Sequence, residues 1–498
     1  VYYHASNKEE EESEHLPAED PMRGMKPTPS MKATLKYIWI VSLLILVQML
    51  AGVITAHYGV EGEGFFGIPL DMILPQAISR SWHVQLAIFW IATSWLATGL
   101  YIAPAVSGHE PKYQKLGVNI LFIALLIVVL GSLAGQWFGV MQKLGLVENF
   151  YFGHQGYEYI ELGRFWQILL LVGLFLWLFL MVRALLPALR KKDENRHLLL
   201  LFVLASVAIA AFYGAGLMYG RQTHMAIAEY WRWWVVHLWV EGFFEVFSTT
   251  LMAFIFVTLG LVSYRAGTIA AISSGAIYLI GGIPGTFHHL YFTGVTSTIV
   301  ATGASFSALE VVPLVLLGYE AFENYTRLHS APWMHRLKWP VYCFIAVSFW
   351  NLVGAGIFGF LINMPVSLFY IQGLNTTAVH AHTALFGVYG FLSLGFVFLI
   401  ARYIRPEVEF NDKLMKFGFW ALNWGLALMV LISLLPIGLI QSWASVTQGL
   451  WLARSEDFMQ QPLLQNLRWL RMVGDTIMIL GALAFFWQIV KVTFTKKQ

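Results

Sequence analysis

The sequence predicts an all-α, polytopic membrane protein with about twelve transmembrane helices. Of its 498 residues, 58% are hydrophobic and only 12% are charged, and the mean hydropathy is +0.64. This composition excludes an ordinary soluble domain. A helix that crosses the hydrocarbon core needs about 20 apolar residues, whereas the strands of a membrane β-barrel alternate over about 10. Long uniform apolar stretches recur near residues 36–57, 82–105, 116–140, 165–187, 197–220, 232–262, 266–292, 297–325, 339–366, 374–403, 414–443 and 467–491.

Basic residues occupy every second connection between these stretches, and the other connections are poor in Lys and Arg. By the positive-inside rule, this alternation predicts that both ends of the chain are cytoplasmic. The residues that carry the signal are Lys26, Lys32, Lys36, Lys112, Lys115, Arg183, Arg190, Lys191, Lys192, Arg196, Arg265, Arg327, Arg336, Lys338, Arg402, Arg405, Lys413, Lys416, Lys496 and Lys497.

The chain divides into a short polar segment and one membrane domain. Residues 1–35 include the acidic run NKEEEESE and predict a solvated cytoplasmic connector, and residues 36–498 predict the twelve-helix catalytic domain. Because the chain begins with Val and has no signal peptide, we expect that upstream sequence is missing. The single cysteine, Cys343, excludes an intrachain disulfide, and no CxxCH motif is present. We see no nucleotide-binding loop and expect no nucleic-acid partner.

Two histidines one residue apart, His380 and His382, lie inside the tenth apolar stretch. On an α-helix a step of two residues turns by about 200°, so the two imidazoles leave from nearly opposite faces. One helix can therefore offer axial ligands to two flat cofactors, one on each side. This spacing predicts a short path for electrons between two haems.

Other ionisable residues lie inside the apolar stretches, where they are costly and usually functional or paired. A lone membrane histidine is more often a packing residue than a ligand. The predicted topology, however, brings six histidines to a similar depth in the outer half of the bilayer, and a shared level favours a metal site. The residues are His83, His237, Glu241, Glu245, His288, His289 and Glu310, besides His380 and His382.

The spacing of these residues favours an iron site. His237 and Glu241 are four residues apart and therefore face the same side of a helix. Pro284 precedes His288 and His289, and the distortion that it causes would let two adjacent histidines reach one ion. Three imidazoles with a carboxylate suit iron better than copper, because the oxygen ligand is harder. A zinc site of the HExxH kind is less favoured, since the spacing here is HxxxE.

Five stretches read HLWVEGFFEVF, GTFHHLYFTG, FSALEVVPL, FWNLVGAGIFGFLIN and VHAHTALFGVYG. Here the chain resembles the catalytic subunit of bacterial nitric oxide reductases, which belong to the haem–copper oxidase superfamily. The resemblance covers essentially residues 36–491 and implies a location in the bacterial inner membrane and a role in electron transport during denitrification. It implies that His83 and His382 are the axial ligands of a low-spin haem b. It further implies that His380 is the proximal ligand of a high-spin haem b3.

The same resemblance implies a non-haem iron next to haem b3. Its ligands would be His237, His288, His289 and Glu241, with Glu245 and Glu310 nearby for proton supply and hydrogen bonding. From the residues alone, Glu245 is a positioning group, a proton carrier or a paired interhelical carboxylate. In oxygen-reducing relatives, the span that begins with the histidine corresponding to His237 carries a tyrosine and has no carboxylate ligand at the position of Glu241. The presence of Glu241 in this chain therefore favours nitric oxide as the substrate.

Two further sites follow from the resemblance. In HYGVEGEGFFG and RMVGDTIM, the residues His57, Glu61, Phe65 and Asp475 match the pocket of the quinol-oxidising class. A polar set beside an aromatic ring suits a quinol that must lose two protons, although an ordinary interfacial cluster is the alternative. In GHQGYEYIELGRFW, Glu158 resembles a carboxylate that binds calcium between haem propionates. Glu161 is an alternative ligand, and both are alternatively surface charges.

These inferences converge on a quinol-dependent nitric oxide reductase that couples two NO molecules to nitrous oxide and water in the lipid bilayer. The quinol class normally adds an N-terminal span and an outer domain resembling cytochrome c, so we expect a truncated chain or a separate partner subunit. Two rivals stay open: a nitric oxide dismutase, and a transporter that uses buried carboxylates and histidines as a proton relay. The sequence also leaves four points open: which quinol is oxidised, which side of the membrane supplies the protons, whether the protein forms a homodimer, and whether it reduces oxygen slowly.

Overall fold

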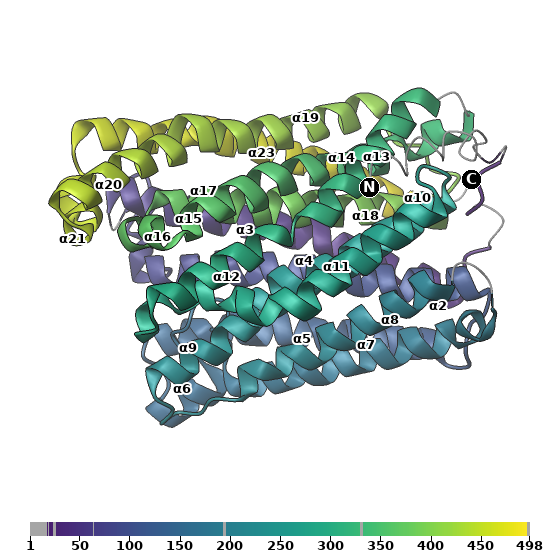
Figure 1. Ribbon diagram of the computed structural model, residues 1–498, viewed down its shortest axis with the longest axis horizontal. Helices are drawn as coiled ribbons and strands as arrows, with labels where there is room; N and C mark the ends of the chain where they lie inside the picture. Colours follow the sequence, from purple (N-terminus) through teal and green to yellow (C-terminus); the bar gives the residue numbers. More distant parts are fainter. Residues whose placement is uncertain are drawn as a thin grey trace.

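The computed structural model describes residues 17, 19–22, 26–62, 64–192, 196–328 and 332–495, and these residues form a bundle of long helices (Figure 1). Twelve helices in the described part of the chain are long and apolar enough to cross a membrane, which confirms the predicted all-α, polytopic class. Much of the 1–35 connector lies outside the described residues, and its role stays a prediction. The first span begins at Pro29, inside that segment.

The first seven spans contain the following elements. They are α2 (Pro29–Ala33) with α3 (Leu35–Glu61), α4 (Gln76–Ser107), α5 (Gln114–Val140), α7 (Arg164–Arg190), α8 (Arg196–Phe212) with η2 (Tyr213–Leu217), α9 (Met225–Trp233) with η3 (Trp234–Phe243) and α10 (Phe244–Thr258), and α11 (Tyr264–Gly285) with η4 (Thr286–Thr293). Short helices η1 (Leu70–Met72) and α6 (Leu146–Phe152) lie in the connections.

The last five spans are more often interrupted. They are α12 (Ser297–Leu309) with α13 (Val312–Leu328); η5 (Pro332–Leu337), α14 (Lys338–Trp350), η6 (Asn351–Phe358) and α15 (Gly359–Asn363); α17 (Asn375–Ala384), η7 (Leu385–Gly390) and α18 (Phe391–Ile404); α19 (Asp412–Met429), η8 (Val430–Leu434) and α20 (Leu435–Gln448); and α23 (Pro462–Phe494). Helices α16 (Pro365–Ile371), α21 (Leu450–Arg454) and α22 (Glu456–Met459) connect them.

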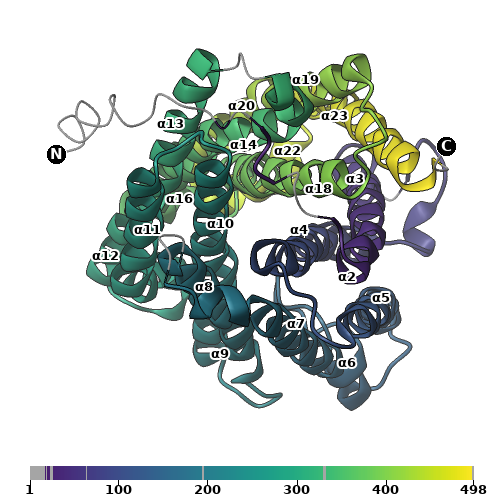
Figure 2. The same ribbon diagram turned by 90° about the vertical axis from the view of Figure 1, so that its right-hand side faces the viewer.

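Three spans form the interior of the bundle. The most apolar windows of the second, sixth and tenth spans are 94%, 89% and 89% buried, whereas the windows of the other spans are at most half buried. Figure 2 shows the parts of these spans labelled α4, α10 and α18 inside a surrounding ring of helices. The second, sixth and tenth spans carry His83, His237 and the His380–His382 pair, respectively. His83, His237, His380 and His382 therefore lie on the three most buried spans, whereas His288 and His289 lie on the seventh span, whose window is 39% buried.

Four elements of the described chain, namely η3, η6, η7 and η8, are π-helical. Such turns are rare and occur frequently at functional sites. The element η3 contains His237 and Glu241, and η7 directly follows the helix that carries His380 and His382. The regular α-helix expected across residues 232–262 is therefore interrupted where the candidate ligands lie.

Candidate metal and cofactor centre

Three histidines from two spans converge at one point. Nitrogens of His237, His288 and His289 all lie within 4.8 Å of one another. His237 is provided by η3, while His288 and His289 are provided by η4, a 3₁₀ turn that follows Pro284 at the end of α11. The predicted distortion after Pro284 is thus present, because the α-helix tightens into 3₁₀ geometry. It brings two successive imidazoles to the same side.

Glu241 adds a carboxylate to this cluster. Its Oε2 atom lies 2.7 Å from Nδ1 of His237 and 3.6 Å from Nε2 of His289. Glu310 reaches His237 from the junction of α12 and α13, with 3.5 Å between Oε1 and Nε2 of the histidine. The structure therefore brings together all the residues that the sequence assigns to the iron site, and Glu310 with them.

The cluster has the properties of a metal site. Nε2 of His237, Nδ1 of His288 and Nε2 of His289 are buried and have no hydrogen-bond partner among the described residues. Buried polar atoms are normally satisfied, so three unsatisfied ring nitrogens at one point fit a bound cation. The mixed imidazole and carboxylate donors are suited to a divalent iron.

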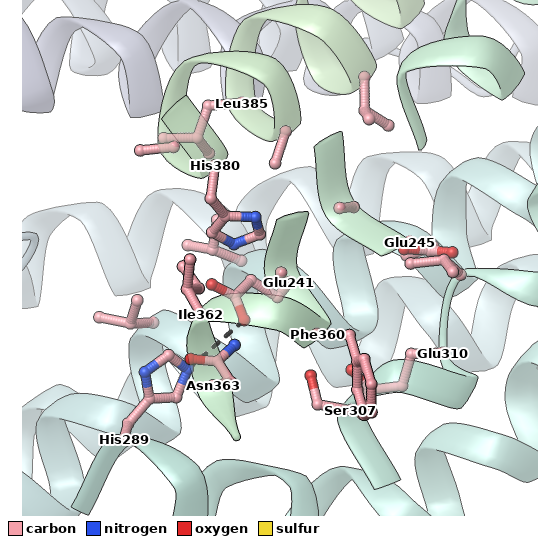
Figure 3. A pocket seen from close by; sticks show the side chains of 18 of the residues that line it. Glu241, Glu245, His289, Ser307, Glu310, Phe360, Ile362, Asn363, His380 and Leu385 are labelled. Carbon is pink, nitrogen blue, oxygen red and sulfur yellow. Dashed lines mark ion pairs between the residues drawn. The ribbon is translucent and has the colours of Figure 1, made fainter. Parts of the chain in front are cut away.

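A large cavity separates this cluster from His380. It contains about 1260 Å³ of space free of protein atoms, part of it open to solvent. Figure 3 shows His380 on one side of the cavity and His289 on the other, with Glu241 between them and Glu245 and Glu310 to one side. Glu245 is buried, and its Oε1 accepts a hydrogen bond of 3.5 Å from Nδ2 of Asn351. The arrangement fits a flat cofactor on His380 that faces a metal ion.

Helix α17 carries both His380 and His382, and its opposite face borders a second cavity. His382 lines this cavity together with His83, and about 430 Å³ is free of protein atoms there. The two imidazole centroids are 6.0 Å apart, with 34° between the ring planes. The rings are close enough that His83 and His382 could together hold one metal ion between them. The prediction that His380 and His382 address opposite sides of one helix is thus in agreement with the cavities.

The three candidate haem ligands are oriented in the same way. Nδ1 of His83 donates to the carbonyl oxygen of Gln48 at 2.9 Å, Nδ1 of His380 donates to Gly354 at 2.8 Å, and Nδ1 of His382 donates to Ala378 at 2.7 Å. This leaves Nε2 as the candidate ligating atom of each ring, although Nε2 of His83 lies 3.3 Å from Nε2 of Gln48 and Nε2 of His382 lies 3.4 Å from Arg471. Metal-binding histidines usually donate their second nitrogen in this way. Both haem positions consequently fit the residues that are present.

The four candidate quinol residues fall into two groups. His57 Nε2 lies 2.7 Å from Glu61 Oε2, and the ring of Phe65 lies 4.7 Å from that of His57. Asp475 instead pairs with Arg471 at 3.0 Å and lines the cavity of His83 and His382. The first group lies at the end of α3 and the second on α23, two helices that pack against each other.

Sequence reasoning missed several polar and aromatic neighbours of these sites. Arg471 Nη2 lies 3.4 Å from His382 Nε2, and Trp469 and Phe66 pack around the ring of His57. Tyr278 and Tyr389 line the cavity beside Glu241. Arg471 could have been found from the sequence, because it is a basic residue inside the twelfth apolar stretch. The aromatic neighbours could not, because aromatic residues are frequent throughout this chain.

The candidate calcium ligands have different surroundings. Glu158 is partly exposed and lies 2.6 Å from Arg80 and 3.9 Å from Arg232. Glu161 is 3% exposed and accepts hydrogen bonds from Ser81 and Gln85. The guanidinium groups already balance the charge of Glu158, so a cation there would need further anionic ligands. Glu158 as the calcium ligand stays a prediction.

Glu161 makes the stability of the protein depend on pH. Burial raises the pKa of this carboxyl to about 7, against the opposing hydrogen bond from Gln85. A carboxyl with a raised folded-state pKa contributes stability below its unfolded pKa and loses it as pH rises through about 7. One pKa unit corresponds to about 1.4 kcal/mol, so the loss reaches at most about 3.5 kcal/mol.

We therefore expect Glu161→Gln to remove part of this pH dependence. Thermal melting in a calcium chelator should show the melting temperature of the wild type falling between pH 5 and pH 8, and that of the variant falling less. Glu148→Gln, in the exposed helix α6, serves as the control. Parallel melting curves for the wild type and Glu161→Gln would refute the expectation.

Known proteins resemble this chain both in sequence and in fold. Residues 32–477 match the family described as cytochrome c and quinol oxidase polypeptide I. A nitric oxide reductase subunit from Stutzerimonas stutzeri is 25% identical over 471 residues, which cover 92% of this chain and 94% of that protein. A haem–copper terminal oxidase dimer solved by electron cryomicroscopy has a similar fold, with a TM-score of 0.65 and 14% identity. That match covers 94% of this chain and 85% of the other.

Proposed function

The chain belongs to the cytochrome c and quinol oxidase polypeptide I family, and from that starting point we propose that it is a quinol-oxidising nitric oxide reductase. Family membership makes it a multi-span membrane oxidoreductase with haems and a metal centre. The proposed reaction consumes one quinol and two NO molecules and yields quinone, nitrous oxide and water, so that electrons and protons balance. The similarity to the nitric oxide reductase subunit from Stutzerimonas stutzeri supports this choice of substrate.

The observation that carries the proposal is the carboxylate of Glu241 in the histidine cluster. It lies 2.7 Å from His237 and 3.6 Å from His289 and lines the cavity that His380 borders from the other side. A hard oxygen donor beside three imidazoles selects iron rather than copper. We infer that His237, His288, His289 and Glu241 hold a non-haem iron.

The same geometry distributes the other roles. His83 and His382 would hold a low-spin haem b, and His380 a high-spin haem b3. When bound, these haems and the iron supply electron transfer and the binding of NO. Ala381 lies between the two ligands of α17 and lines the cavity, which makes the distance between the haem positions short.

Carboxyl groups around the cavity would handle protons. Glu310 contacts His237, and Glu245 is buried one helical turn beyond Glu241 beside Asn351. Buried carboxyls next to a reaction cavity can hold protons and release them to the anionic oxygen that leaves as water. These assignments make Glu245 and Glu310 proton carriers and Glu241 chiefly a ligand.

The electron donor in this proposal is quinol. His57 and Glu61 form a close acid–base pair beside Phe65, which suits the removal of a hydroxyl proton. Asp475 lies on the wall of the low-spin haem cavity, where it would face the electron acceptor. We further propose that the protein lies in the bacterial inner membrane with both described ends cytoplasmic, and that a calcium ion binds at Glu158.

A purified, haem-loaded protein tests the function directly. We expect b-type haem bands in a reduced-minus-oxidised spectrum and nitrous oxide formation from NO only when quinol is added. Dinitrogen and oxygen formed without quinol would indicate a dismutase instead. Absence of haem would favour the proton-coupled transporter and end the proposal.

Replacing Glu241 by alanine is expected to lower both iron content and turnover. Loss of one donor of a buried metal site should reduce iron retention and NO reduction at least about 10-fold, with haem content unchanged. Iron and haem analysis together with an NO electrode provide the measurements. Glu409→Ala, whose side chain is 77% exposed, is the control. Full iron content and full turnover in the Glu241 variant would contradict the ligand role.

A further inference from the structure

Two tyrosine hydroxyls meet at the backbone of Glu241. Tyr278 of α11 and Tyr389 of η7 each donate a hydrogen bond to the carbonyl oxygen of Glu241, and both distances are 3.2 Å. A carbonyl oxygen has two lone pairs and can accept both bonds. The seventh and tenth spans are thereby tied to the sixth at the residue whose carboxylate contacts His237 and His289.

Packing fixes the positions of both hydroxyls. The side chains are buried, with 3% exposure for Tyr278 and 5% for Tyr389. Tyr278 packs so closely on η3 that a Cβ at Gly242 would lie 3.1 Å from its ring. The ring of Tyr389 meets Trp95 edge to face, with 5.5 Å between centroids. Neither hydroxyl can move away without repacking its ring.

We propose that Tyr278 and Tyr389 are positioning residues that fix the backbone of Glu241 and keep its carboxylate directed at the metal-binding histidines. This inference rests on the proposed function, in that Glu241 is taken as a metal ligand. Glu241 lies in the π-helical element η3, and the rarity of such turns indicates that surrounding contacts maintain them. Groups that orient a ligand from outside the coordination sphere typically change metal affinity by 10- to 100-fold.

The alternative is that the hydroxyls merely satisfy a buried carbonyl group. In that case their removal would lower stability without a specific effect on the metal. Tyr37 provides a matched control, because its buried hydroxyl donates a 2.6 Å hydrogen bond to the carbonyl oxygen of Val118 and joins α3 to α5, which carry none of the candidate iron ligands. The variant Tyr37→Phe therefore removes the same kind of bond elsewhere in the bundle.

The test compares iron release from the haem-loaded variants Tyr278→Phe, Tyr389→Phe and Tyr37→Phe. Each protein is dialysed against a ferrous-iron chelator, and iron, haem content and melting temperature are followed. We expect both site variants to lose non-haem iron about 10-fold faster than the wild type. Haem content should stay intact, and the melting temperature should shift no more than in Tyr37→Phe.

Two outcomes would overturn the proposal. One is iron release at the rate of Tyr37→Phe in both site variants. The other is a parallel loss of haem, stability and iron, which would show a structural role only. A wild type that retains iron but does not reduce NO would refute the proposed function, and the release rates would still decide whether the tyrosines position Glu241.

Discussion

Replacing Gly285 by alanine is expected to abolish iron binding and NO reduction. A Cβ at this position would lie 2.7 Å from Nε2 of His237 and 3.0 Å from Oε1 of Glu310. The added methyl group therefore occupies the space in front of a ring nitrogen of His237 that has no hydrogen-bond partner among the described residues. Because η3 is buried and α11 packs closely on it, with a Cβ at Gly282 only 2.9 Å from Leu238, the two helices have little room to separate and restore the site. We expect less than about one hundredth of wild-type turnover, in line with the largest effects on metal sites.

The same helix offers a matched control. No atom of the described residues lies within 4 Å of a Cβ built at Gly275, apart from the local helix backbone. Gly275→Ala should keep its iron and its activity. Metal analysis, haem spectra and NO consumption of the two variants are compared in parallel. Normal iron content in Gly285→Ala would show that the metal does not bind at Nε2 of His237.

Alanine substitutions at His382 and His380 are expected to remove different haems. His382→Ala should lose the low-spin spectrum and the reduction of the protein by quinol, because the cavity shared with His83 loses one axial ligand. His380→Ala should keep the low-spin spectrum and lose the high-spin haem. Each variant should retain about one haem of two, and turnover should fall at least about 100-fold.

Pyridine haemochrome quantification and low-temperature spectra distinguish the two variants. The variant His109→Ala removes an exposed histidine between the second and third spans and should behave as the wild type. Identical spectra for His380→Ala and His382→Ala would contradict the assignment of the two rings to separate cavities.

Hydropathy alone predicted the twelve spans, because a lipid-facing helix must be apolar over its whole length. The candidate ligands were equally visible in the sequence. A single histidine or glutamate inside an apolar stretch can be a packing residue, but several at one predicted depth in the bilayer favour a metal site. The His237–Glu241 contact followed from their spacing. The π-helical form of η3 did not, because its sequence has no feature that separates it from an α-helix.

The candidate quinol residues show the limit of local patterns. His57, Glu61 and Phe65 are close in sequence and meet in space, whereas Asp475 is distant in sequence and lies at the other cavity. Its place depends on how α23 packs on α3, which no spacing rule determines. Tyr278 and Tyr389 escaped notice for a related reason, since hydroxyls that meet at a backbone carbonyl leave no pattern in a chain with 21 tyrosines.

The π-helical turns in the interior make the length of the sixth span as important as its composition. In an α-helix each residue turns the chain by about 100°. Deleting one residue between His237 and Glu245 while η3 keeps its π-helical geometry would rotate everything beyond the deletion relative to His237. Glu245 would then leave the wall of the cavity although no functional side chain had been changed. Substitutions should thus be tolerated at many positions of this span where single-residue deletions are not.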